Sequence, residues 1–353
     1  MKKIVLLVLA VALMVSCFCG CGDDKVTINV YNWGEYISDG SEGTLDVNAA
    51  FEEYYYETYG QKVKVNYTTY ETNEEMYNKL KSSNDNYDIV IPSEYMISKL
   101  IREKMLLEIN YDNIPNAQYI LPSLRDPSYD PGNAHSVPYM WGTVGILYNT
   151  KYVDEADVTG WELLWNEKYD DKILMFDNSR DAFGIAQYLL GYDVNTTDEA
   201  QLRECADLLA QQRPLVQQYV MDQIYDLMEN EEAWIAPYYV GDYVAMAENN
   251  PDLGFFLPQN QGFNLFTDAM CIPTCAREKD AAELFINFLC EPQIAAANMD
   301  WVGYSVPLSA AKEYLDPEVV EDPVAYPSDE VISNGSSYSY LLPSVTRFVE
   351  TLF

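Results

Sequence analysis

Two hydrophobic periods alternate along the chain from Val26 onward, and this alternation constrains the fold more than any other feature. Residues 26–31 and 62–67 alternate apolar and polar side chains, whereas residues 44–59 carry apolar side chains at helical spacing and are followed by Gly60. A period of two is typical of a strand and a period near 3.6 is typical of a helix. The order strand, helix, strand therefore predicts an α/β fold with a doubly wound sheet.

The pattern continues beyond this first unit. Thr72 and Glu75 have capping-box spacing, which predicts the start of a helix, and residues 87–92 form a short apolar run that predicts a third strand. We expect further strands at residues 143–148, 172–176, 234–240 and 254–257, and helices at residues 182–190 and 280–289. The chain has 353 residues and shows no repeat or low-complexity linker, so we expect two lobes joined by several crossings.

Aromatic and acidic side chains gather where these strands are expected to end. The runs are Tyr-Asn-Trp-Gly-Glu-Tyr at 31–36, Ser-Glu-Tyr at 93–95, Tyr-Val-Gly-Asp at 239–242 and Phe-Thr-Asp at 266–268. Doubly wound sheets bind their ligands beyond the carboxyl ends of the strands. Because ring faces attract a cation and carboxylates neutralise it, the sequence predicts a binding site for a small organic cation.

The charge balance favours a cationic ligand and argues against nucleic acid as a partner. The chain carries 56 acidic and 21 basic residues, a net charge of −35. Phosphate binding needs a basic surface, whereas an acidic field concentrates cations. An alternative interpretation of most of these acids is that they keep an exported protein soluble. Hydrophobic residues make up 48% of the chain, which predicts a globular protein rather than a disordered acidic one.

The first 25 residues predict export and lipid anchoring. Two lysines precede an apolar run at residues 4–15, which is too short to span a bilayer stably. The following stretch resembles a bacterial lipoprotein signal, so we expect a signal peptide at residues 1–20, a lipid on Cys21 and a tether at residues 21–25. Cys17 is the alternative lipidation site, and an ordinary cleaved signal peptide is the alternative interpretation. The protein is then extracytoplasmic and contacts the membrane through the lipid alone.

The remaining reactive side chains form no recognisable catalytic or metal-binding motif. Cys205, Cys271, Cys275 and Cys290 are expected to be small buried residues first and disulfide partners second, with the pairing left open. His135, the single histidine, is expected on a surface loop. No nucleophile elbow, P-loop or metalloprotease helix is visible, so we expect neither an enzyme nor a metal or cofactor.

Four ordered segments together resemble the spermidine/putrescine-binding proteins of bacterial ABC importers. They are residues 31–36, Tyr-Glu-Thr-Asn-Glu-Glu-Met at 70–76, Val-Pro-Tyr-Met-Trp-Gly at 137–142 and Pro-Leu-Ser-Ala-Ala at 307–311. The resemblance implies a two-lobed type II periplasmic-binding-protein fold with the ligand in the cleft between the lobes. It places lobe 1 at residues 26–141 plus 268–309, and lobe 2 at residues 142–267 plus 310–353.

The resemblance and the strand-end runs together imply a set of ligand-binding residues. The set is Trp33, Glu35, Tyr36, Ser93, Tyr95, Asn178, Asp181, Tyr239, Asp242, Phe266, Asp268, Tyr304 and Tyr338. Asp181 and Asp268 match positions that receive ammonium groups in the family. The chain departs from the family where Asn178 replaces an Asp and where Tyr239 and Phe266 each replace a Trp.

We expect this protein to capture putrescine, spermidine or both and to deliver them to an ABC permease, acting as a monomer. One alternative keeps the fold but changes the cargo to an amino acid, an opine or a sugar. A cargo with a carboxylate needs an arginine, and Arg180 is the only arginine near a predicted strand end. A second alternative is a secreted hydrolase that depends on two carboxylates with room for water between them.

Overall fold

The computed structural model describes residues 25–82 and 85–353. Within them, ten strands form a mixed sheet in the order β2-β1-β3-β9-β4-β7-β5-β6, with β8 beside β4 and β10 beside β9. The strands are β1 (Val26–Trp33), β2 (Val63–Tyr70), β3 (Ile89–Val90), β4 (Ser136–Asn149), β5 (Ile173–Phe176), β6 (Val216–Val220), β7 (Ile235–Tyr239), β8 (Leu253–Phe256), β9 (Phe263–Cys271) and β10 (Gly335–Ser336). The predicted signal peptide and the lipidation sites Cys21 and Cys17 lie outside the described residues.

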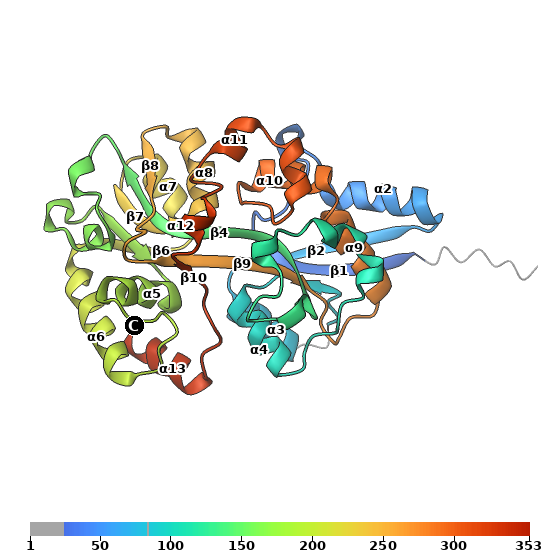
Figure 1. Cartoon of the computed structure of the whole chain (residues 1–353), viewed down its shortest axis with the longest axis horizontal. Coiled ribbons are helices and arrows are strands. Elements are labelled where there is room, and N and C mark those ends of the chain that lie inside the picture. Colours follow the sequence, from blue (N-terminus) through green and yellow to red (C-terminus); the bar gives the residue numbers. More distant parts are fainter. Residues whose placement is uncertain (1–24, 83–84) are drawn as a thin grey trace, which may run out of the picture.

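Helices cover both halves of this sheet (Figure 1). They are α2 (Val47–Tyr59), α3 (Asn73–Ser82), α4 (Glu94–Arg102), α5 (Ser179–Leu190), α6 (Glu199–Gln212), α7 (Ile224–Glu229), α8 (Val240–Asn249), α9 (Lys279–Leu289), α10 (Pro292–Val302), α11 (Pro317–Glu321), α12 (Asp329–Ile332) and α13 (Pro343–Leu352). None of the helices in the described ranges is long and apolar enough to cross a membrane.

The first half of the molecule contains the strand–helix unit predicted from the sequence. β1 pairs in parallel with β2 on one side and with β3 on the other. Between β1 and β2, helix α2 begins where the Asp46 side chain accepts the backbone N–H of Ala49, and it ends at Gly60 with φ 67°. Such caps satisfy backbone groups that a helix leaves unpaired at its ends. The helix buries Val47 and Phe51 against the sheet, as the helical spacing predicted.

The second half is built around β5, β6, β7 and β8, with α5 and α6 packed beside them (Figure 1). The predicted helix at residues 182–190 begins three residues earlier, at Ser179. The reason is Asn178, whose side-chain oxygen accepts the backbone N–H groups of Arg180 and Asp181 and so caps the first turn.

Two long antiparallel strands, β4 and β9, run through both halves of the molecule (Figure 1). The first part of β4 pairs with β9, and its last part pairs with β7 and β8. This arrangement confirms the predicted two-lobed α/β fold. The lobe boundaries at 141/142 and 267/268 fall inside these strands and stay predictions.

The crossing strands also correct two predictions. The strand expected at residues 143–148 begins at Ser136, and residues 266–268, expected after a strand end, lie inside β9. Strands that are covered on both faces are apolar at nearly every position, so alternation does not mark their ends. Nearly every residue of β4 and β9 is buried, including Asp268.

The four cysteines of the described residues are unpaired, and Cys205, Cys271 and Cys290 are buried as expected. His135 lies in the loop before β4, where its Nδ1 is 3.2 Å from Oδ1 of the buried Asp130. Its side chain is partly buried, so the expected surface histidine is tied to the first half of the molecule instead.

Candidate functional site: buried aspartates on a row of aromatic rings

Asp268 lies in β9, where two hydroxyl groups hold its carboxylate. The Ser93 hydroxyl donates to Oδ1 at 2.7 Å, and the Tyr36 hydroxyl donates to Oδ2 at 2.8 Å. Ser93 is the N-cap of α4, and Tyr36 follows β1, so both lie beyond strand ends of the first half. The structure therefore brings together three predicted site residues, although Asp268 lies more than 170 positions along the chain from both Tyr36 and Ser93.

Two further aspartates come from the second half and are also held by tyrosines. The Tyr225 hydroxyl donates to Oδ1 of Asp242 at 2.5 Å, and the Tyr304 hydroxyl donates to Oδ2 of the same carboxylate. The Tyr239 hydroxyl donates to Oδ2 of Asp181 at 2.7 Å. Each of the three aspartates thus accepts a hydrogen bond from at least one aromatic side chain.

Four aromatic rings, three of which hold these aspartates, form one continuous row. Tyr36 packs edge-to-face on Tyr304 at 5.3 Å between centroids, Tyr304 packs on Phe266 at 5.8 Å, and Phe266 packs on Tyr239 at 5.5 Å. A Cβ atom at Gly241 would lie 2.6 Å from the Tyr304 ring, so glycine is needed there for the ring to approach. The row joins Asp268 to the aspartates of the second half through direct ring contacts.

Burial controls the ionisation of all three carboxyl groups. It raises the pKa of Asp268 to about 6, although two hydroxyl donors counteract the rise. It also raises the pKa of Asp242 to about 6 and shifts the pKa of Asp181 upward. Burial disfavours the charged form of a carboxyl group, whereas a cation within a few ångströms favours it, so a bound cation would lower these pKa values again.

The remaining predicted residues occupy the edges of this arrangement. Trp33 packs against Tyr70 at 4.7 Å between ring centroids, and its buried Nε1 has no hydrogen-bond partner among the described residues. The Tyr95 hydroxyl accepts from Asn73 Nδ2 at 3.0 Å. Glu35 is exposed in the turn before Tyr36, with φ 48°.

Two predicted residues act through helix α5 rather than through the ring row. Asn178 uses its side-chain oxygen to cap α5 beside Asp181. Tyr338 is buried, lies under the guanidinium of Arg180 at 4.3 Å, and its hydroxyl faces Asp181. Both residues therefore position or border Asp181.

A buried pair, Tyr139 and Asn298, supports the loop that carries Tyr36, and the sequence reasoning did not select either residue. The Tyr139 hydroxyl donates to the backbone oxygen of Tyr36 at 2.6 Å and accepts from Asn298 Nδ2 at 2.8 Å. Asn298 Oδ1 in turn accepts the backbone N–H of Ser38 at 2.8 Å. Residue 139 lies within one of the family-like segments, which was the available signal.

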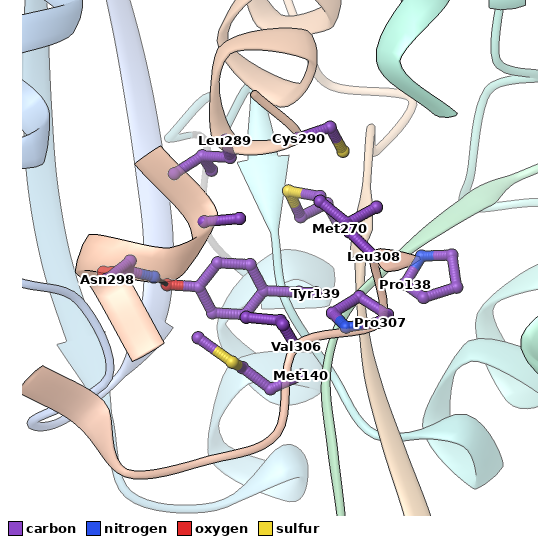
Figure 2. Close-up of a pocket in the computed structure, with 11 residues that line it drawn as sticks. Pro138, Tyr139, Met140, Met270, Leu289, Cys290, Asn298, Val306, Pro307 and Leu308 are labelled. Atoms are coloured by element: carbon purple, nitrogen blue, oxygen red, sulfur yellow. Dashed lines mark hydrogen bonds between the residues drawn. The ribbon is translucent and has the colours of Figure 1, made fainter. Parts of the chain in front are cut away.

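Figure 2 shows Tyr139 and Asn298 beside a small cavity that is lined mostly by apolar side chains, including Met140, Met270 and Leu289. Its volume is about 10 Å³, room for no more than one water molecule. This cavity is therefore a packing gap beside Tyr139 and Asn298, and none of the three aspartates lines it.

Two other residues of the site were missed by the sequence reasoning. Tyr225 of α7 holds Asp242 but lies outside every strand-end run. Glu94, inside the Ser-Glu-Tyr run, is 1% exposed and accepts the backbone N–H groups of Thr267 and Tyr338. No group of three or more potential metal ligands is assembled within residues 25–82 and 85–353.

The two halves, the crossing strands and the acidic ring-lined site between them define a type II periplasmic binding protein. Residues 49–327 match the family described as "Bacterial extracellular solute-binding protein", and the chain belongs to this family. The spermidine/putrescine-binding periplasmic protein of Escherichia coli K12 is 33% identical over 314 residues, which cover 89% of this chain and 86% of that protein.

Solved structures show the same likeness. A putative spermidine/putrescine ABC transporter protein from Listeria monocytogenes superposes with a TM-score of 0.83 at 33% identity, covering 92% of this chain and 97% of that one. The spermidine/putrescine transporter substrate-binding protein PotD from Streptococcus pneumoniae gives a TM-score of 0.80 at 36% identity, covering 93% and 97%. These relatives confirm the family resemblance inferred from the sequence.

Proposed function

We propose that this protein binds a polyamine, putrescine or spermidine, in the cleft between its two halves and delivers it to an ABC permease. The observation that carries the proposal is the ring row that joins Asp268, Asp242 and Asp181. The names of the relatives support the same cargo.

The site has the chemistry that an alkyl polyamine needs. A carboxylate offers about four lone-pair sites, so Asp268 keeps acceptor capacity beyond its two hydroxyl donors. Each charge-assisted hydrogen bond contributes about 1.5–3 kcal/mol, and a cation over a ring contributes about 0.5–2 kcal/mol. The ring row would pack on the methylene groups while the aspartates receive the ammonium groups.

We assign the predicted residues to three roles. The direct cargo contacts are Tyr36, Ser93, Asp181, Tyr239, Asp242, Phe266, Asp268 and Tyr304. Trp33, Tyr95 and Tyr338 border the cargo, Asn178 positions Asp181, and Glu35 lies at the exposed rim. Tyr225 joins the set because it holds Asp242.

The site argues against the two alternative functions. Arg180 donates to the backbone oxygen of Val194 at 2.9 Å and to Asn195 Oδ1 at 2.8 Å, so it is engaged rather than available to a carboxylate cargo. A hydrolase needs two carboxylates that share a water, whereas ring contacts separate Asp268 from Asp181.

Calorimetric titration of the chain without its first 21 residues tests the proposed cargo. We expect saturable binding of putrescine or spermidine, and no binding of glutamate or glucose as representatives of the alternatives. The proposal would be contradicted if neither polyamine produced a heat of binding or raised the melting temperature.

We also propose that the mature protein is a monomer, tethered at the outer face of the cell membrane by a lipid on Cys21, or on Cys17. The signal-like segment at residues 1–21 supports this proposal. The mass of the mature N-terminal peptide from cells is expected to include the lipid, and an unmodified cysteine there would contradict it. Sedimentation of the soluble chain tests the monomer.

A further inference from the structure

One buried carboxylate outside the assigned cargo contacts connects three elements around the site. Glu94 is the first residue of α4, and its side chain is almost completely buried. Its Oε2 accepts the backbone N–H of Thr267 at 3.2 Å, and its Oε1 accepts the backbone N–H of Tyr338 at 3.1 Å. Glu94 therefore ties α4 to β9 and to the segment that follows β10.

Glu94 is also a near neighbour of Asp268 through adjacent backbone positions. Ser93 forms an isolated β-bridge with Asp268 and donates its hydroxyl to that carboxylate. The next residue of α4, Glu94, receives the N–H of Thr267, which directly precedes Asp268. The two carboxylates thus lie on the same short contact between α4 and β9.

Glu94 is also linked to Asp181 through Tyr338. Tyr338, held by its backbone, places its ring under Arg180 and its hydroxyl toward Asp181. A Cβ atom at Gly184 would lie 2.2 Å from the Tyr338 hydroxyl, so the ring fits closely against α5. A displacement of the Tyr338 backbone would therefore reach Asp181.

We propose that Glu94 is a positioning residue of the polyamine site, which holds Thr267 and Tyr338 around the cargo and gives up a proton when a cation occupies Asp268. This inference rests on the proposed function. Glu94 acts through its neighbours and is not assigned a direct contact with the cargo.

The charges around Glu94 determine whether a cation at Asp268 raises or lowers the pKa of Glu94. The groups that face it are Asp268 of β9, Tyr95 of α4, Tyr338, Tyr129 of the loop before β4, and Arg180 and Tyr188 of α5. Burial and, next, the charge of Asp268 raise the pKa of Glu94 to about 8. A cation on Asp268 offsets that repulsion and lowers the pKa of Glu94 again.

Linkage makes the coupling reciprocal. If cargo lowers the pKa of Glu94 by about one unit, ionised Glu94 raises cargo affinity about tenfold. This gain in affinity is absent at a pH where Glu94 is protonated in both the cargo-free and the cargo-bound protein. It is complete at a pH where Glu94 is ionised in both.

The experiment compares the wild type with Glu94→Gln in titrations with putrescine from about pH 6 to pH 8.5. We expect the variant to bind about equally well near pH 6 and about tenfold more weakly near pH 8.5. In buffers of different ionisation enthalpy near pH 7.5, the wild type should release protons on binding, and the variant should release fewer. Glu199→Gln is the matched control, because Glu199 is the exposed first residue of α6.

Each outcome decides the inference. A gap between wild type and variant that does not change with pH, or equal proton release, overturns the role of Glu94 and leaves the proposed function standing. No binding by the wild type overturns both. If the variant does not unfold cooperatively, the wild type alone decides, because absence of proton release near pH 7.5 would contradict the inference.

Discussion

At the scale of single residues, Asp268 is the carboxylate on which the cleft depends most. We expect Asp268→Asn to weaken putrescine binding about 10- to 200-fold, the equivalent of one charge-assisted hydrogen bond of about 1.5–3 kcal/mol. The melting temperature of the cargo-free protein should not fall at neutral pH, because the substitution removes a buried charge whose ionisation folding disfavours.

Calorimetry and thermal unfolding of the same preparations check this prediction. Asp207→Asn is the control, since Asp207 is exposed on α6. Unchanged affinity in Asp268→Asn would show that this carboxylate does not receive the cargo. A parallel loss of melting temperature would assign it a structural role instead.

The raised carboxyl pKa values also predict how pH acts on the cleft. The folded-state pKa values of Asp268 and Asp242, about 6, exceed the unfolded value of about 3.9. The folded state therefore binds more protons than the unfolded state between these values, and the contribution of both groups to stability falls as the pH rises from about 4 to 6.

Cargo binding has the opposite pH dependence, because ammonium groups need ionised carboxylates. We expect polyamine affinity to rise with pH from about 4.5 to 7 as Asp268 and Asp242 ionise, before the separate rise that Glu94 adds above pH 7, and the melting shift caused by putrescine to grow over the same range. Titrations at several pH values measure this. An affinity that is constant from pH 4.5 to 7 would mean that neither carboxyl group titrates on binding.

The residues of the site were only partly predictable from the sequence. Asp242 and Asp268 could be selected because each ends a run that carries an aromatic residue, and Asp181 because the family resemblance places an ammonium-binding acid there. Tyr225 could not, since its hydroxyl reaches Asp242 only through the packing of α7 on α8. Tyr36, Tyr239 and Tyr304 were expected to offer their ring faces. In the structure their hydroxyl groups also donate hydrogen bonds to the aspartates.

At the scale of elements, α10 and β4 together hold the loop that follows β1. We expect Tyr139→Phe to destabilise the fold by about 1–3 kcal/mol, because it leaves the amide of Asn298 without its buried acceptor and the backbone oxygen of Tyr36 with only the longer 3.4 Å contact from Asn32 Nδ2. Affinity for putrescine should fall as well, since the loop carries Tyr36 to Asp268.

Chemical denaturation and calorimetry measure both effects. Tyr56→Phe is the matched control, because Tyr56 is 53% exposed on α2. In a Tyr36→Phe background, Tyr139→Phe should cost less affinity but the same stability. Equal loss of affinity in both backgrounds would contradict the positioning role.

Elements with a local signal were predicted well, and those without one were not. Helix α2 has an Asp cap, a periodic apolar face and a terminal glycine, so its position followed from the chain itself. The lengths of β4 and β9 depend on burial from both sides, which is a property of the assembled sheet. Register between these strands likewise has no local signature.

At the scale of the whole molecule, the net charge of −35 should steer the cargo. The acidic field raises the local concentration of a small dication, and salt screens that field within about 10 Å at 0.1 M. We expect the association rate constant for putrescine to fall several-fold between about 20 and 300 mM salt. Stopped-flow fluorescence measures it, with the dissociation rate as the internal control, and salt-independent association would contradict the prediction.

Because β4 and β9 run through both halves, truncations and deletions in the gene affect the two halves together. Each half is completed by chain that is synthesised before and after the other. A stop codon within β4 or β9, or a deletion of either strand, therefore removes chain that both halves need. Variants of this gene can alter the binding site by point substitution, but no single contiguous fragment of the gene encodes one complete half of the protein.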